Sequence, residues 1–142
     1  MSKICVILGS KSDQELGDKI IETLKKFPVE YVLEVASAHR EPEKLDKIVE
    51  KSDADVFVTV AGLSAALPGA VASKTVRPVI GVPKEAKLSG LDSLLSMVQM
   101  PPGVPVAVVG IDNAKNGALL ALEILALKDG KIRKALEELR KG

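Results

Sequence analysis

Short apolar runs alternate along this chain with longer segments in which apolar residues recur every three or four positions. Five of the runs are rich in branched side chains, and they predict strands at residues 3–8, 31–36, 56–60, 78–82 and 104–109. The segments between them are typical of amphipathic helices. Leu16, Ile20 and Leu24, for example, share one face of a helix that follows the first strand. Two further helices are expected after the last strand.

Strands that alternate with helices indicate a parallel sheet with helices on both faces, because each crossover must pack back onto the sheet. We therefore predict an α/β fold for residues 1–142 as one domain: a three-layer, doubly wound parallel sheet with strand order 2-1-3-4-5. In that order the chain reverses direction between the first and third strands. The loops that follow the first three strands are then expected to meet at one crevice.

The first of these loops, residues 9–13, combines a glycine with two serines and an aspartate ahead of a helix. Glycine allows a sharp turn, and hydroxyls together with the amino end of a helix offer donors to an anion such as phosphate. Ser12 and Glu15 also fit a capping box, in which side chains satisfy the first backbone donors of the helix without a ligand. Neither the Walker pattern nor Gly-x-Gly-x-x-Gly occurs, which argues against a nucleoside triphosphatase and the usual dinucleotide site.

The second loop, Ser37-Ala38-His39-Arg40, carries the only histidine of the chain directly after an apolar strand. An imidazole both gives and takes a proton near neutral pH, whereas a guanidinium stays charged and suits a phosphate or a carboxylate. A single histidine is often only a capping or exposed residue, so His39 alone does not establish catalysis. The expected meeting of three polar loops favours an active site here.

Composition argues against several classes of partner. A net charge of +1 gives no general attraction to nucleic acid, and 2% aromatic residues leave little on which bases could stack. Cys5 is expected to be a small buried residue of the first strand, and one cysteine with one histidine makes no transition-metal site. The apolar stretches are too often interrupted to span a membrane, and no targeting signal is visible, so we expect a cytoplasmic protein.

Residues 117–127 are apolar on almost every side of a predicted helix, with Glu123 as the only charge. A helix on the surface of a monomer is expected to have a polar face. We therefore predict that this helix packs against another copy of the chain and that the protein is a homo-oligomer.

Four motifs in this order resemble a known family. They are Gly9-Ser10-Lys11-Ser12-Asp13, Ser37-Ala38-His39-Arg40, Leu67-Pro68-Gly69, and the segment 91–101 with Leu-Asp-Ser-Leu-Leu-Ser and Val-Gln-Met-Pro. Together they resemble the N5-carboxyaminoimidazole ribonucleotide mutases of de novo purine synthesis, over essentially the whole chain. The resemblance implies a flavodoxin-like fold and an octamer with active sites where subunits meet. It also implies a small-molecule substrate and no metal or organic cofactor.

The resemblance also implies roles for individual residues. The ribose phosphate end of the substrate would be held by Ser10, Ser12, Asp13, Ser37 and Arg40. His39 would transfer the proton at ring carbon C4, while the carboxylate leaves the exocyclic amine as carbon dioxide, stays trapped and is recaptured at C4. This activity is that of an isomerase.

The third loop departs from the pattern of the bacterial mutases, Gly-Gly-Ala-Ala-His-Leu-Pro-Gly. Leu63 replaces the second glycine and Ala66 replaces the histidine, which leaves His39 without a partner imidazole. A related class carboxylates aminoimidazole ribonucleotide directly with carbon dioxide, as a lyase, and usually carries lysine after the first histidine. Arg40 favours the mutase, and direct carboxylation is the alternative. A non-enzymatic module that binds a phosphoribosyl ligand is the alternative from another class.

Overall fold

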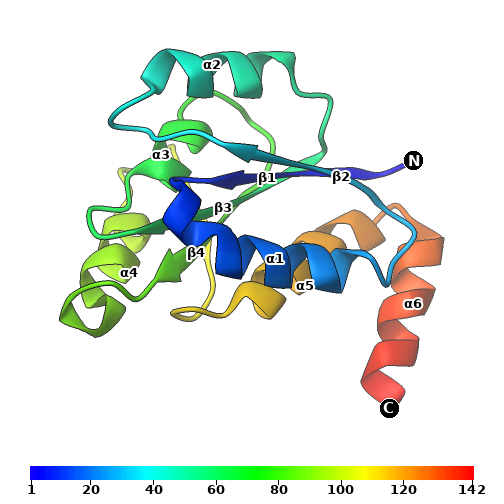
Figure 1. Cartoon of the computed structure of the whole chain (residues 1–142). Coiled ribbons are helices and arrows are strands. Elements are labelled where there is room, and N and C mark those ends of the chain that lie inside the picture. The colour runs from blue at the N-terminus through cyan, green and yellow to red at the C-terminus, as the bar shows by residue number, and fades with distance from the viewer.

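The sheet of the computed structural model, which describes residues 1–142, contains five parallel strands in the order β2-β1-β3-β4-β5. The strands are β1 (Lys3–Leu8), β2 (Glu30–Val35), β3 (Val56–Gly62), β4 (Val79–Lys84) and β5 (Ala107–Val108). Helices lie on both sides of the sheet (Figure 1), so the predicted doubly wound α/β fold and strand order are confirmed. Leu8 pairs with Val35 on one side and Val60 on the other, which brings the carboxyl ends of three strands to one edge.

Six helices complete the fold. They are α1 (Gln14–Leu24), α2 (Pro42–Lys51), α3 (Leu67–Ala72), α4 (Leu91–Val98), α5 (Ala114–Ala126) and α6 (Gly130–Lys141), with two short 3-10 turns, η1 (Lys11–Asp13) and η2 (Leu88–Gly90). Helices α1 and α5 pack on one face of the sheet, and α2, α3 and α4 pack on the other. No helix has both the length and the apolar character needed to cross a membrane.

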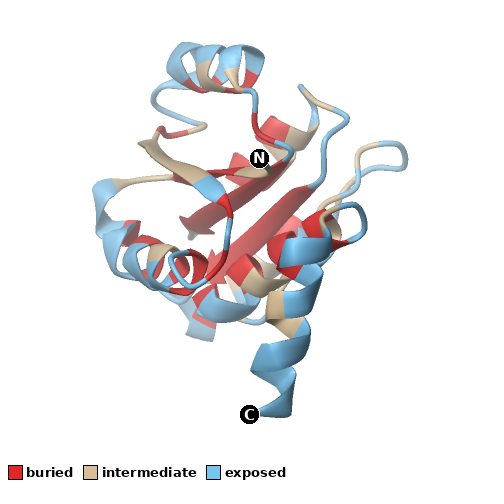
Figure 2. Ribbon diagram, turned by 90° about the vertical axis from the view of Figure 1, so that its right-hand side faces the viewer, coloured by how far each residue is buried: buried red, intermediate tan, exposed pale blue.

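The central strands are apolar on both faces because each face is covered by helices. In β1, Ile4, Val6 and Leu8 join the core beneath α1 and α5, whereas Cys5 and Ile7 join the core on the other side. All five are essentially inaccessible to solvent, and the buried residues of the chain concentrate in the central strands (Figure 2). Fully burying one branched side chain is worth about 1.5–3 kcal/mol, so these strands hold the layers together.

The largest difference from the expected elements is at the fifth strand, where residues 104–109 were expected to pair. Only Ala107–Val108 forms a strand, paired with Ile80 and Gly81 of β4. Pro105 has no backbone N–H to donate, and a proline within a sheet is confined to an edge strand or to the start of a strand, so the pairing begins only after it. At the other side of β4 the pairing runs further than expected, because Gly62 of β3 lies opposite Lys84.

Helix α4 turns its leucines outward. Leu91, Leu95 and Val98 share one face, and each is about half exposed. The sheet side of the helix instead carries Ser93, whose hydroxyl donates to the carbonyls of Lys84 at 2.8 Å and Gly90 at 3.0 Å, and the fully buried Met97. The buried hydroxyl therefore fixes the helix in an orientation that leaves an apolar stripe at the surface.

Helix α5 is covered within its own chain more fully than its sequence indicates. It packs against α1 and α6 as well as the sheet, and only Leu119, Leu120 and Ile124 of its apolar residues are half-buried rather than buried. Helix α6 extends away from the body of the molecule (Figure 1), with Ile132 as its one fully buried residue. The oligomer stays a prediction, and the outward face of α4 now offers a more exposed apolar surface than α5.

Candidate functional site

A crevice of about 480 Å³ lies at the carboxyl ends of the central strands. It is lined by the loops that follow β1, β2 and β3, as the strand order predicts, and by the end of β4. All six residues expected at the site line this crevice: Ser10, Ser12, Asp13, Ser37, His39 and Arg40. Residues from four separate segments of the chain therefore converge on one cavity.

The loop after β1 is shaped by a close approach to β3. The N–H of Gly9 donates to Val60 O at 2.9 Å, and a Cβ on Gly9 would lie 3.3 Å from that oxygen and 3.4 Å from Asp13 Oδ2. The hydroxyl oxygens of Ser10 and Ser12 are 2.6 Å apart, which places two hydroxyls side by side at the crevice. A glycine at position 9 therefore brings a pair of hydrogen-bonding groups to the cavity.

The predicted capping box of Ser12 and Glu15 is wrong. The chain first makes the 3-10 turn η1, so α1 begins at Gln14 and Ser12 lies within the turn instead of capping the helix. Asp13 Oδ2 accepts the N–H of Ser10 at 3.0 Å, while Glu15 is exposed. The aspartate expected to contact a ligand therefore also holds the turn that carries the two serines.

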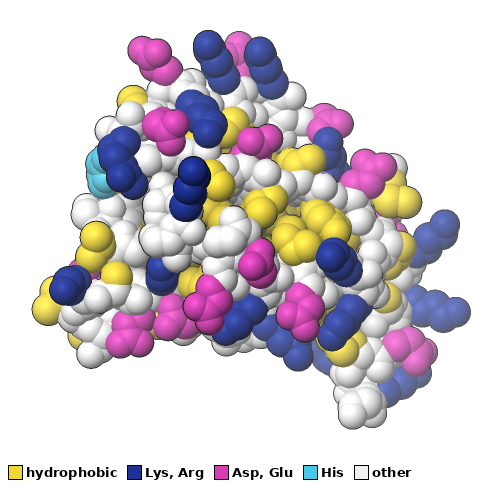
Figure 3. Space-filling view, viewed as in Figure 1, with side chains coloured by type: hydrophobic (Ala, Val, Ile, Leu, Met, Phe, Trp, Pro, Cys, Tyr) yellow, Lys and Arg dark blue, Asp and Glu magenta, His cyan; other side chains and the backbone are white.

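The loop after β2 continues the sheet for one more residue, because the N–H of Ala36 donates to Leu8 O at 2.9 Å. Ser37 is buried, and its hydroxyl oxygen accepts the N–H of Arg40 at 3.1 Å, which leaves the hydroxyl proton available to another acceptor. His39 and Arg40 lie at the margin of the crevice, and both are exposed. Figure 3 shows the histidine at the surface, beside a basic side chain.

The loop after β3 holds Leu63 in the left-handed region of backbone conformation, with φ of 57°. Such a conformation costs a residue with a Cβ about 1–2 kcal/mol, and glycine adopts it without that cost. Leu63 is 51% exposed, so no buried contact explains the choice of leucine. The loop thus retains a conformation suited to glycine although leucine replaces it, and Ala66 lines the crevice near the start of α3.

Lys84 is the residue that the sequence interpretation missed. It is the last residue of β4, and its ammonium lies 3.6 Å from Asp13 Oδ1 and donates to the carbonyl oxygen of Ser12. A lysine two residues beyond the predicted strand gives no sign of this role, since lysines in loops are usually solvated. The useful signal was its place at the end of a strand next to the crevice.

The crevice carries more positive than negative charge. The ionisable side chains that line it are Asp13, His39, Arg40 and Lys84, so Asp13 is the only carboxylate. Burial raises the pKa of Asp13, whereas Lys84 and the N–H groups of Ser10 and Gly9 act in the opposite direction. Two cations against one carboxylate suit an anionic ligand.

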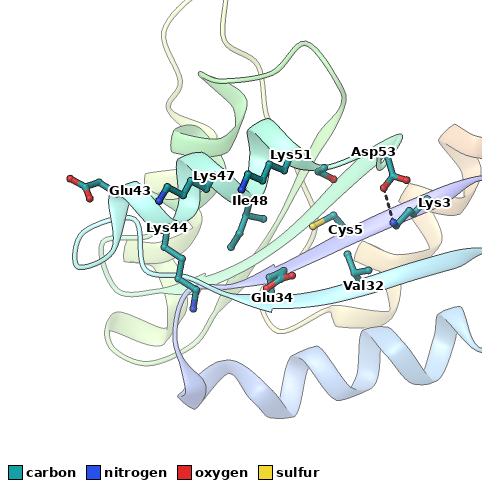
Figure 4. A pocket seen from close by; sticks show the side chains of 11 residues that line it. Lys3, Cys5, Val32, Glu34, Glu43, Lys44, Lys47, Ile48, Lys51 and Asp53 are labelled. Atoms are coloured by element: carbon teal, nitrogen blue, oxygen red, sulfur yellow. Dashed lines mark ion pairs between the residues drawn. The ribbon is translucent and has the colours of Figure 1, made fainter.

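A second groove, of about 570 Å³, lies between α2 and the strands β1 and β2 (Figure 4). Lys3 is paired there with Asp53 at 2.6 Å, and three other lysines that line the groove come from α2. Cys5 lies at its floor, and burial raises the pKa of the thiol to about 11, so the thiol is protonated at neutral pH. No loop from the carboxyl ends of the strands contributes a catalytic group, and the crevice at His39 is the better candidate.

Comparisons with known proteins agree on one family. Residues 3–142 match the family model described as AIR carboxylase. The chain is 61% identical over 137 residues to the N5-carboxyaminoimidazole ribonucleotide mutase of Methanocaldococcus jannaschii, a match that covers 96% of this chain and 87% of the relative. Identity to the mutase of Pyrococcus abyssi is 50% over 144 residues, covering 99% of this chain and 83% of that one.

Solved structures show the same architecture. The crystal structure of Treponema denticola PurE superposes with a TM-score of 0.91 at 29% identity, covering 99% of this chain and 90% of that chain. A second crystal structure, of a variant of PurE2 from the same organism, has a TM-score of 0.89 at 31% identity, with 99% and 91% covered. The fold and the sequence thus lead to the same group of proteins.

Proposed function

This chain belongs to the AIR carboxylase family, and on that premise we propose that it converts N5-carboxyaminoimidazole ribonucleotide to 4-carboxy-5-aminoimidazole ribonucleotide in purine biosynthesis. The observation that carries the proposal is the placement of His39, the only imidazole of the chain, in a cavity with Arg40 and paired serine hydroxyls. A proton-transfer group thus lies beside an anion-binding surface.

The ribose phosphate end of the substrate is held at the loop after β1. The hydroxyls of Ser10 and Ser12 donate to phosphate oxygens, and the guanidinium of Arg40 supplies a fixed positive charge. Ser37 adds its free hydroxyl proton, and the carboxylate of Asp13 accepts from the ribose. Because these groups neutralise the charged end, the aminoimidazole ring is directed to the other end of the crevice.

His39 transfers the protons of the rearrangement. As the bond between the exocyclic nitrogen and the carboxyl carbon breaks, its electron pair stays on the nitrogen, which takes up a proton from protonated His39. C4 of the electron-rich ring then attacks the trapped carbon dioxide, and His39 removes the proton that C4 still carries. Protons given and taken balance, so the reaction is an isomerisation that uses the chain's own groups.

Turnover tests the proposal directly. The purified protein is incubated with N5-carboxyaminoimidazole ribonucleotide, and separately with aminoimidazole ribonucleotide, each with and without bicarbonate. Conversion of the first substrate without bicarbonate is expected. Carboxylation of the second only when bicarbonate is present would identify a direct carboxylase instead, and binding without any product would indicate a non-catalytic module. His39→Asn serves as the matched control for background chemistry.

We also propose that the protein is a homo-oligomer, an octamer by its likeness to the family. The support from its own residues is the exposed apolar stripe of α4, with Leu91, Leu95 and Val98 about half exposed. Light scattering at micromolar concentration tests this proposal, and a particle of the 15.0 kDa chain mass would contradict it.

A further inference from the structure

We propose that Lys84 is a positioning residue, which holds Asp13 and the turn from Ser10 to Asp13 in the form that receives the ribose phosphate end of the ligand. The identity of that ligand rests on the proposed function. The contacts of Lys84 with Asp13 and Ser12 do not depend on the proposed function, because they are made within the chain. No role follows for Lys84 from the sequence motifs that define the site.

Lys84 connects two parts of the crevice that the sheet keeps apart. It ends β4, while the turn follows β1, and β3 lies between these strands. The Lys84 ammonium bridges this distance, with Asp13 Oδ1 at 3.6 Å and the carbonyl of Ser12 as an acceptor. It therefore contacts both the side chain that closes the turn and the backbone of the turn itself.

Lys84 is in turn fixed from the opposite side. Its carbonyl accepts the hydroxyl of Ser93, a fully buried residue of α4, at 2.8 Å. Asp13 in turn contacts the start of the turn, since its Oδ2 accepts the N–H of Ser10 at 3.0 Å. A continuous series of polar contacts thus runs from α4 through Lys84 and Asp13 to Ser10.

The positive charge of Lys84 stabilises the ionised form of the buried Asp13 carboxylate. Asp13 is only 4% exposed, and a carboxylate so placed needs a counter-ion to stay ionised. The other charged groups nearby are the exposed Lys11 of the same turn, and His39 and Arg40 of the loop after β2. None of these three side chains forms an ion pair with Asp13. The loop after β3 contributes no charged side chain to the crevice. Lys84 is the one cation in contact with this carboxylate.

The test compares Lys84→Met with Lys84→Arg and with Lys87→Met, an exposed lysine outside the crevice, as the matched control. In Lys84→Met we expect KM to rise by about 10-fold or more with kcat within about threefold, because binding geometry is lost while His39 remains. Lys84→Arg is expected to restore KM, and Lys87→Met to match the wild type. An unchanged KM, or a fall in kcat alone, would overturn the proposal.

A pH profile separates positioning from a merely structural role. Lys84 lowers the pKa of Asp13, so without Lys84 the carboxyl takes up its proton at higher pH, and affinity in Lys84→Met should begin to fall at a higher pH than in the wild type as the solution is acidified. Superimposable profiles would refute the inference. If Lys84→Met does not fold, Lys84→Gln takes its place in the same comparison.

Failure of the proposed function is recognised independently. Calorimetry with ribose 5-phosphate as the probe measures the phosphate end alone, so it needs no turnover. Weaker binding to Lys84→Met than to Lys87→Met supports the inference even if the wild type converts neither ribonucleotide. Equal binding to both variants refutes it, whatever reaction the protein catalyses.

Discussion

Substitution of Gly117 by alanine should destabilise the protein, although alanine is the better helix former. Gly117 lies in α5 against the sheet, and a Cβ there would be 2.5 Å from Cγ2 of Val82 and 3.6 Å from Cγ1 of Val58. Alanine in a helix gains about 1 kcal/mol over glycine. Overpacking a rigid core costs about 1–3 kcal/mol, and Val82 is fully buried in β4, so the cost should lie near the upper end.

The net effect expected for Gly117→Ala is a loss of about 1–2 kcal/mol, or a fall in Tm of roughly 3–8 °C for a chain of this size. Thermal and urea unfolding at one fixed protein concentration measure it. Gly130→Ala is the control, because no atom lies within 4 Å of the added Cβ at the start of α6. A Gly117→Ala protein as stable as the wild type would show that α5 can move away from β4, and the packing argument would fail.

Two other substitutions test the site, and a third tests the backbone of the loop after β3. His39→Asn should retain ligand binding while turnover falls by about 100-fold or more, together with loss of solvent exchange at C4 of aminoimidazole ribonucleotide; turnover near the wild-type rate would contradict its role. Arg40→Ala should weaken ribonucleotide binding by about 2–4 kcal/mol, and an unchanged affinity would show that the phosphate lies elsewhere. Leu63→Gly should stabilise the fold by about 0.5–1 kcal/mol, because relief of the left-handed leucine exceeds the entropy that glycine adds to the unfolded chain; a less stable variant would mean that Leu63 makes a useful contact.

The fold could be predicted because its main determinants are local. Runs such as Ile4 to Leu8 are buried on both faces of a parallel sheet, and their continuous apolar composition predicts that burial. The orientation of α4 could not be predicted in this way. Its leucine face is the apolar one, yet that face is turned to solvent, while the buried Ser93 shares its one hydroxyl proton between two backbone carbonyls on the sheet side. Which side of an amphipathic helix is covered depends on the rest of the chain as well as on the helix.

Site residues that directly follow a strand could be predicted from the sequence. Those whose role depends on contacts distant in sequence could not. His39 and Arg40 follow β2, and their residue types alone suggested proton transfer and anion binding. Asp13 was expected to contact the ligand because of the family resemblance, but its burial and its ion pair with Lys84 of β4 could not be seen in the sequence. The contact between Lys84 and Ser12 spans 72 positions, so no local pattern reveals it.

The buried thiol of Cys5 can report how often the structure around β1 opens, because only an open form exposes the sulfur to a reagent. Cys5 is 1% exposed in a strand paired on both sides, and with its pKa raised to about 11 it is almost wholly in the unreactive thiol form at neutral pH. Alkylation by a thiol reagent therefore requires α2 and the strands around Cys5 to move apart. Because the chain has no other cysteine, the rate of labelling gives the free energy of that opening at a single known position. A ligand that binds in the crevice and stabilises the folded state should slow the labelling without touching the sulfur.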